Sequence, residues 1–85
     1  MRLTAAVRQQ LLNQNEGFEK TVPTRQKNFS EDRTYRITGG KLYIRISGNT
    51  SWADSRYSHD FAPATEEQTH RFLYEYKGAL NTEGL

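Results

Sequence analysis

Hydrophobic and polar residues alternate from residue 34 to residue 46, in the sequence TYRITGGKLYIRI. Alternation with a period of two is typical of a β-strand that turns one face toward the core. The Gly39-Gly40 pair in the middle suits a two-residue type I′ turn, because both central residues of that turn have positive φ. A turn there sets Ile37 opposite Leu42, so the turn and the hydrophobic residues require the same register. The stretch therefore predicts a β-hairpin.

The two faces of this hairpin differ in chemistry. The apolar face consists of Tyr35, Ile37, Leu42, Ile44 and Ile46. The opposite face is basic and aromatic and carries Arg36, Lys41, Tyr43 and Arg45. We expect the apolar face to form the core with a helix at the end of the chain, and the basic aromatic face to point away from it.

Two helices are predicted at the ends of the chain. Thr4 is a suitable N-cap for a helix over about residues 5–15. Near the C-terminus, Thr65 and Gln68 have the spacing of a capping box, in which each side chain bonds the backbone of the other residue. The helix that follows has apolar positions every three or four residues, namely Phe72, Leu73, Tyr76 and Leu80. Residues 81–85 are expected to fray.

A second turn is expected at Gly48-Asn49, after which a third strand would run back along the hairpin. A two-residue loop there would set Ile46 opposite Ser51, Arg45 opposite Trp52 and Tyr43 opposite Asp54. This register keeps Trp52 on the basic aromatic face, beside Arg45.

Residues 18–32 leave two alternatives open. Pro23 disfavours a central strand, whereas residues 24–29 could form an edge strand that turns into the hairpin. Taken together, the patterns predict a single α+β domain over residues 1–85. Its three-stranded antiparallel sheet is flanked by N- and C-terminal helices, in the order α-β-β-β-α.

Composition restricts the chain to one small domain. With 85 residues and no cysteine, it has one modest core and neither disulfides nor thiolate metal ligands to support it. The net charge is only +2, but residues 20–45 hold seven basic and two acidic side chains, and residues 46–85 hold three basic and six acidic ones. Such a separation of charge steers charged partners. The lack of cysteine favours a cytoplasmic location, and neither a signal peptide nor a membrane span is predicted.

Catalysis and metal binding find little support in the sequence. Ser58, His59 and Asp60 are the residue types of a catalytic triad, but adjacent residues of a strand point to opposite faces and cannot pass one proton. Glu66 lies one helical turn from His70, a spacing that is common on helix surfaces. No phosphate-binding loop opens a helix. We therefore predict no enzyme activity, no cofactor and no metal site.

The basic aromatic face is the first candidate for a binding site. With the third strand added, it comprises Arg36, Lys41, Tyr43, Arg45, Trp52 and Arg56. Protein interfaces are rich in Trp, Tyr and Arg anchors, while such sheets also bind RNA or single-stranded DNA through phosphates and stacked bases. Two structural alternatives stay open. Either a helix covers the face and makes Tyr43 and Trp52 part of the core, or Arg45 only stacks on Trp52.

An acidic surface is the second candidate. It comprises Asp54, Asp60, Glu66 and Glu67. Its carboxylates could enter the basic groove of a nucleic-acid-handling enzyme and compete there with the natural ligand. The two candidates differ in sign of charge, so charge reversal on one of them distinguishes them.

The chain resembles the small accessory inhibitors of phages and mobile elements, anti-CRISPR proteins among them, in its size, its lack of cysteines and catalytic motifs, its order of elements and its polarised charge. This resemblance extends over the whole chain as architecture and assigns no role to any residue. It implies a rigid protein that binds a host defence or replication enzyme and blocks its nucleic-acid site or locks its conformation. We accordingly expect a non-enzymatic inhibitor or modulator of a macromolecular machine that acts by protein contact, with nucleic-acid binding as the alternative.

Overall fold

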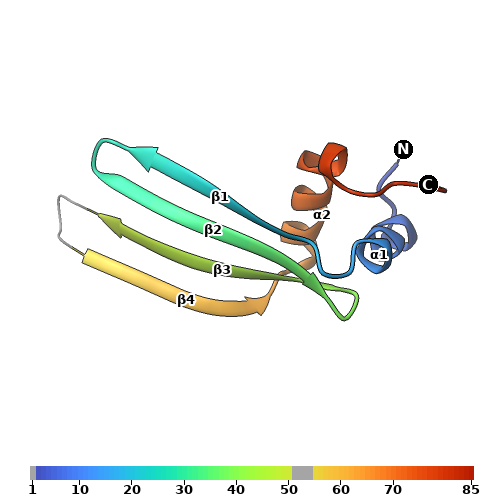
Figure 1. The fold of residues 1–85 in the computed structure, drawn as a ribbon, viewed down its shortest axis with the longest axis horizontal. Coiled ribbons are helices and arrows are strands. Elements are labelled where there is room, and N and C mark those ends of the chain that lie inside the picture. Colours follow the sequence, from blue (N-terminus) through green and yellow to red (C-terminus); the bar gives the residue numbers. More distant parts are fainter. Residues whose placement is uncertain (1, 51–54) are drawn as a thin grey trace.

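The computed structural model describes residues 2–50 and 55–85. Along the chain its elements are α1 (Ala5–Gln14), β1 (Glu19–Gln26), β2 (Phe29–Thr38), β3 (Lys41–Thr50), β4 (Ser55–Pro63), α2 (Glu66–Glu75) and the short 3₁₀ helix η1 (Lys77–Ala79). The strands form one antiparallel sheet in the order β1-β2-β3-β4, and both helices lie at one end of it (Figure 1). The α+β class and the terminal helices are confirmed. The predicted three-stranded sheet is wrong, because the sheet has four strands.

Strand β1 is the additional strand. It pairs with β2 over its whole length, from Glu19 opposite Arg36 to Gln26 opposite Phe29. Pro23 fits in this strand because β1 lies at the edge of the sheet and needs only one of its two sides for pairing. Of the two alternatives for residues 18–32, the fold adopts an edge strand, but the bounds predicted for it, residues 24–29, are wrong, because β1 ends at Gln26 and Phe29 already begins β2.

The turn expected at Gly48-Asn49 is wrong, because β3 runs through both residues. Ile46 consequently lies opposite His59 rather than Ser51. Tyr43 lies opposite Pro63 rather than Asp54, and the register between β3 and β4 shifts near Arg45. The expected neighbour of Arg45, Trp52, lies outside the described residues.

Gly48 has a packing role instead of a turn role. It lies opposite Tyr57, and a Cβ atom at Gly48 would meet the Tyr57 hydroxyl oxygen at 2.5 Å. The Tyr57 ring thus crosses β3 at this position, and its hydroxyl donates a hydrogen bond of 2.9 Å to Glu31 of β2. Glycine within a strand commonly marks such a close approach. Close packing against Tyr57, rather than a turn, is therefore the role of Gly48.

The hairpin between β2 and β3 is confirmed in turn and register. Gly39 and Gly40 have φ values of 61° and 71°, as a type I′ turn requires, and Ile37 lies opposite Leu42. The turn is held by Glu16, whose carboxylate accepts hydrogen bonds from the backbone N–H groups of Gly39 at 3.0 Å and Gly40 at 3.4 Å. These bonds, that of Gly39 foremost, lower the pKa of Glu16 below its ordinary value.

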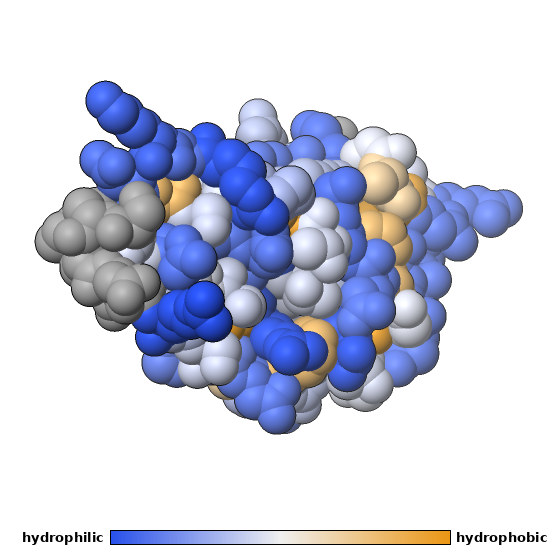
Figure 2. All heavy atoms as spheres, turned by 60° about the vertical axis from the view of Figure 1, so that its left-hand side comes forward, coloured by the Kyte–Doolittle hydropathy of each residue, from blue (hydrophilic) through white to orange (hydrophobic). Residues whose placement is uncertain are grey.

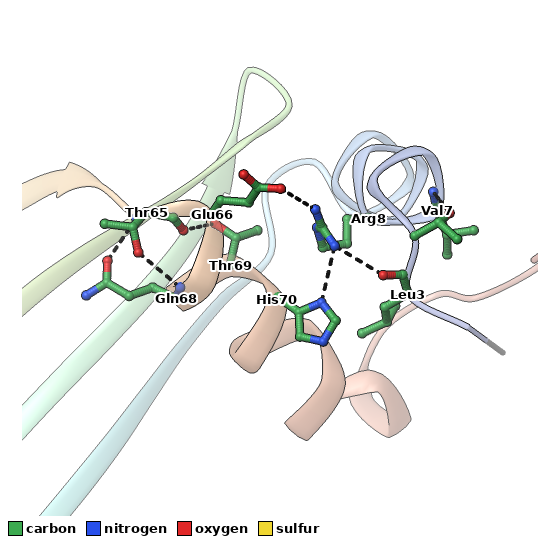
Figure 3. A network of polar contacts seen from close by, with 9 residues as sticks. Leu3, Val7, Arg8, Thr65, Glu66, Gln68, Thr69 and His70 are labelled. Atoms are coloured by element: carbon green, nitrogen blue, oxygen red, sulfur yellow. Dashed lines mark hydrogen bonds and ion pairs between the residues drawn. The ribbon is translucent and has the colours of Figure 1, made fainter.

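Both helices begin at the predicted caps. The Thr4 side chain accepts from the backbone of Val7, and Thr65 forms the full capping box with Gln68. Arg8 of α1 joins the two helices, because its side chain reaches Glu66 and His70 of α2 (Figure 3). Its guanidinium donates to Glu66 Oε1 at 2.7 Å and to the Leu3 carbonyl, and it contacts His70 Nδ1 at 3.2 Å. Arg8 thereby links α1 to the first turns of α2.

The core lies between the helices and the adjoining end of the sheet. Its buried side chains are Leu11, Leu12, Ile37, Leu42, Phe72, Leu73 and Leu80. Tyr35 of β2 stacks on Phe72 of α2, with ring centroids 4.5 Å apart. Ile46 was predicted in this core but is only half-buried and outside the cluster, because the helices cover only one end of the sheet (Figure 1).

The segment after α2 does not fray as expected. Asn15, the C-cap of α1, is buried, and its side-chain amide donates to the carbonyls of Leu11 and Asn81. Its side-chain oxygen accepts from the Asn81 backbone N–H at 2.8 Å. Leu85 also packs against the core. A buried amide with satisfied hydrogen bonds thus fastens the C-terminal segment to the first helix.

The molecule is elongated, with principal extents of 47 × 22 × 19 Å. We call the part of the sheet that packs against the helices the proximal half. The distal half begins with the cross-strand row of Val22, Arg33, Ile46 and His59 and runs to the turn between β1 and β2. No described residue of the distal half belongs to the core cluster.

Candidate interaction surface on the outer sheet face

The outer face is the side of the sheet that points away from both helices. Tyr35, Ile37 and Leu42 turn toward the helices, so their neighbours Arg36 and Tyr43 point to the opposite side. Neither α1 nor α2 covers this side, since both pack on the other one (Figure 1). The alternative in which a helix buries Tyr43 on this face is therefore wrong.

The structure brings most of the predicted basic aromatic residues together. Arg36 and Tyr43 form a cross-strand pair, and Arg45 lies opposite Thr34 on the same face. Lys41 follows the turn on this face, and Arg56 lies at its distal end opposite Asn49. Four of the six predicted residues thus form one proximal group, namely Arg36, Lys41, Tyr43 and Arg45.

Arg36 is already engaged within the chain. Its guanidinium carbon lies 4.0 Å from the centroid of the Phe61 ring, and its nitrogens donate to Glu19 Oε1 at 3.0 and 2.7 Å. Sequence reasoning missed both partners, because Phe61 comes from a strand whose register was misassigned and Glu19 from a strand that was left open. Arg36 is consequently a fixed part of the surface rather than an available charge.

Lys41 and Arg45 differ from Arg36 in this respect. Both side chains are exposed, and none of the ion pairs among the described residues involves them. Tyr43 lies between them in the sequence and is half-buried, so its ring is supported by the sheet while one side remains accessible. Tyr and Arg are residue types that are enriched at interface hot spots, so Tyr43 and Arg45 are the candidate anchors of this face.

A shallow hollow of about 470 Å³ marks the distal part of the outer face. Its lining is small and polar and includes Ser30, Asp32, Ser47, Asn49, Arg56 and Ser58. Beside the hollow, Arg25 donates a hydrogen bond to Asp32 Oδ1 at 2.8 Å. Among the described residues that line the hollow, Arg56 is therefore the available cation. Small side chains at every second position of β2 and β3 were the signal in the sequence that could have located this hollow.

The edges of the sheet are poorly suited to adding a strand. The edge strand β1 contains Pro23, which cannot donate a hydrogen bond, and the edge strand β4 contains a register shift opposite residues 44–46. Both devices are typical of edges that avoid pairing with another chain. A macromolecular partner is therefore better accommodated on a face of the sheet than along its edge.

The predicted acidic residues do not form an unpaired acidic surface. The side chains of Glu66 and Glu67 are 81 and 82% exposed. Glu66 nevertheless pairs with Arg8, and Glu67 pairs with Arg71. Asp60 accepts a hydrogen bond from the backbone N–H of Phe61. Asp54 lies outside the described residues. The surface is thus mixed in charge where it is described.

The residues considered for catalysis are separated by the strand that carries them. Ser58 lines the hollow on the outer face, while His59 lies opposite Ile46, which points to the side of the helices. Among residues 2–50 and 55–85, no three His, Asp or Glu side chains are grouped closely enough to hold a metal ion. No helix in the same ranges is long and apolar enough to cross a membrane.

The chain matches no protein family model, no curated protein and no solved structure. Function is therefore inferred from the surfaces themselves.

Proposed function

We propose that this chain is a non-enzymatic binding protein that inhibits or modulates a macromolecular machine by docking its outer face on a protein partner. The observation that carries the proposal is the group of Lys41, Tyr43 and Arg45 on a sheet face that no helix covers. The partner is an enzyme of host defence or nucleic-acid processing, as the resemblance to phage accessory inhibitors implies. A cytoplasmic setting belongs to the same proposal.

The chemistry of the outer face favours an acidic, partly apolar protein surface as its target. Lys41 and Arg45 supply positive charge, and Tyr43 supplies a ring whose conformational freedom the sheet already restricts. Phe61 is less suited to stack on a nucleotide base, because the Arg36 guanidinium already lies over its ring. This occupied ring is the reason for preferring a protein partner.

A second candidate, binding of RNA or single-stranded DNA, is favoured by the same cations and by a pI of about 9.1. If it applies, affinity for a single-stranded oligonucleotide falls steeply as salt rises, and Tyr43→Ala weakens binding by about 1–3 kcal/mol. Undetectable binding at low ionic strength would remove this candidate.

The proposal is tested by capture of a partner from host lysate, with and without nuclease. The test variant is the double change Tyr43→Ala with Arg45→Ala. Its matched control is Tyr74→Ala with Arg71→Ala, which removes the same two residue types from the exposed surface of α2. We expect the test variant to lose at least about 30-fold in affinity and the control to bind like the parent, in lysate treated with nuclease as well.

Charge reversal separates the two candidate surfaces. If the acidic surface makes the contact, Glu66→Lys with Glu67→Lys abolishes capture and the outer-face variant does not. Equal capture by the parent and the outer-face variant, both folded by circular dichroism, would contradict the proposal.

A further inference from the structure

Within residues 2–50 and 55–85, the distal half also has a second face that no helix covers, on the side of the helices. It carries Val22, Phe29, Ile46 and Tyr57, which are half-buried although no helix lies over them. In the proximal half, the same side of the sheet is covered by α2 (Figure 1). One sheet face is thus covered over one half of its length and open over the other half.

Two charged groups on this open face, Glu31 and Arg33, pair with each other. Glu31 accepts hydrogen bonds from the Tyr57 hydroxyl at 2.9 Å and from Arg33 Nη2 at 3.0 Å, and its side chain is only 14% exposed. The charges of Arg33 and Glu31 cancel, so two such faces can approach each other without repulsion. The face is therefore compatible with contact against an identical face.

The layers of the fold leave space for such a contact. Helices packed on a sheet and sheets packed on sheets both form layers about 10 Å apart. Consider two copies that face each other with their long axes antiparallel. The α2 helix of one copy covers only the proximal half of its sheet. The distal half of the other copy's sheet can then pack beside that helix, at the same distance from the first sheet. The shape of the chain is thus self-complementary about a twofold axis.

Charge supports the same arrangement. Lys27 lies in the turn at the distal tip, and hydrophilic side chains predominate around the tip on the side shown in Figure 2. Glu75 is the last residue of α2. None of the ion pairs among the described residues involves Lys27 or Glu75, whereas Arg25 and Glu67 are paired within the chain. In the antiparallel pair, Lys27 of each copy comes to lie beside Glu75 of the other copy, whereas a parallel pair would set the two Lys27 side chains together.

We propose that two copies of this chain associate through the distal faces on the helix side, in an antiparallel twofold dimer. The distal face is about 19 Å wide, because its four strands lie about 4.8 Å apart, and about 17 Å long, because each strand contributes five residues of about 3.4 Å. A contact of this area is small for a stable interface. The dimer is therefore weak and dependent on concentration. It leaves both outer faces open on opposite sides, so it neither requires nor blocks the function proposed above.

Sedimentation velocity over protein concentrations from about 10 μM to 1 mM tests this proposal. Ile46→Lys is the test variant, because it buries an ammonium group without a partner in the contact, and it should raise the dimer dissociation constant at least about 10-fold. Ser47→Lys is the matched control, since it adds the same charge one residue further on, on the outer face. We expect the control to dimerise like the parent.

A second pair of variants tests the orientation and covers the case that Ile46→Lys does not fold. Lys27→Glu sets a negative charge at the tip beside Glu75 of the other copy and should weaken the dimer, while adding Glu75→Lys to it should restore part of the loss. A parent chain that stays monomeric at 1 mM, or folded Ile46→Lys protein that dimerises as well as the parent, overturns the proposal. Failure of the charge swap to restore any association overturns the antiparallel arrangement.

Discussion

The two halves of the sheet are built from the same four strands but differ in what covers them. In the proximal half, Ile37, Leu42 and Tyr35 pack against Phe72 and the other apolar residues of the helices. In the distal half, Ile46 is only half-buried, and no helix of the described part of the chain covers either face. The ladders that β2 forms with β1 and with β3 are continuous through both halves. The difference shows that a chain of this size concentrates its apolar burial at one end and extends the remaining sheet as a surface.

The largest effect is expected from a substitution in the core of the packed half. Phe72→Ala removes a buried ring that contacts Tyr35, Phe18 and Tyr76, and it should lower the free energy of unfolding by about 2–5 kcal/mol. Ile46→Ala, in the open half, should cost about 1 kcal/mol or less, because the side chain is only half-buried. Urea denaturation measures both. Similar midpoints for the two variants would mean that the halves contribute equally.

The next effect is in the distal half and depends on Gly48. Gly48→Val places a side chain where the Tyr57 ring crosses the strand, so it should destabilise the protein by about 1–3 kcal/mol. Gly78→Ala is the control, since a Cβ there meets nothing within 4 Å and should change stability little. Thermal unfolding followed by circular dichroism compares them. A neutral Gly48→Val would show that the Tyr57 ring does not occupy this position.

A smaller effect concerns the fastening of the C-terminal segment to the packed half. Asn15→Ala removes the bonds to the backbone of Asn81 and should cost about 1–2 kcal/mol. Limited proteolysis should then cut within residues 81–85 before the rest of the chain. A parent-like cleavage pattern in the variant would contradict the role given to Asn15.

The smallest effect is dependent on pH and lies at the hairpin turn. The pKa of Glu16 is lowered in the folded state by the Gly39 N–H group, so its ionised form stabilises the fold. That contribution is complete above the ordinary pKa of 4.5 and is lost as pH falls through the lowered value. Comparison of urea midpoints between pH 7 and pH 3 for the parent and Glu16→Gln isolates it. The variant should lose less stability than the parent, and equal losses would contradict this account.

The packed half was largely predictable from sequence, because several local signals agreed there. Turn residues and hydrophobic alternation both set Ile37 opposite Leu42, and the capping box marked the start of α2 at Thr65. The distal half was not predictable in this way, because one of its faces is polar and the other mixes apolar and polar residues. Gly48 was interpreted as a turn residue. A glycine is needed there because the Tyr57 ring packs against it, and Tyr57 belongs to a different strand.

The same limit applies to the candidate surface. Alternation alone assigned Tyr43 and Arg45 to a shared face, and the structure agrees. It could not reveal that Arg36 stacks on Phe61, because the bulge between β3 and β4 leaves no local signal in the sequence. Sequence alternation thus predicted which side chains share a face within one strand, but not which side chains contact each other between β2 and β4.

Hydrogen exchange measured residue by residue by NMR, at a protein concentration low enough to keep the chain monomeric, tests the division of the sheet most directly. Strand β3 is suited to it because it is paired on both sides along both halves. Amides of residues 42–44 should exchange only through global unfolding, whereas those of residues 46–49 should exchange at least about 10-fold faster through local opening of the distal half. Equal protection along β3 would show that the sheet is one cooperative unit and would contradict the division into a packed half and an open half.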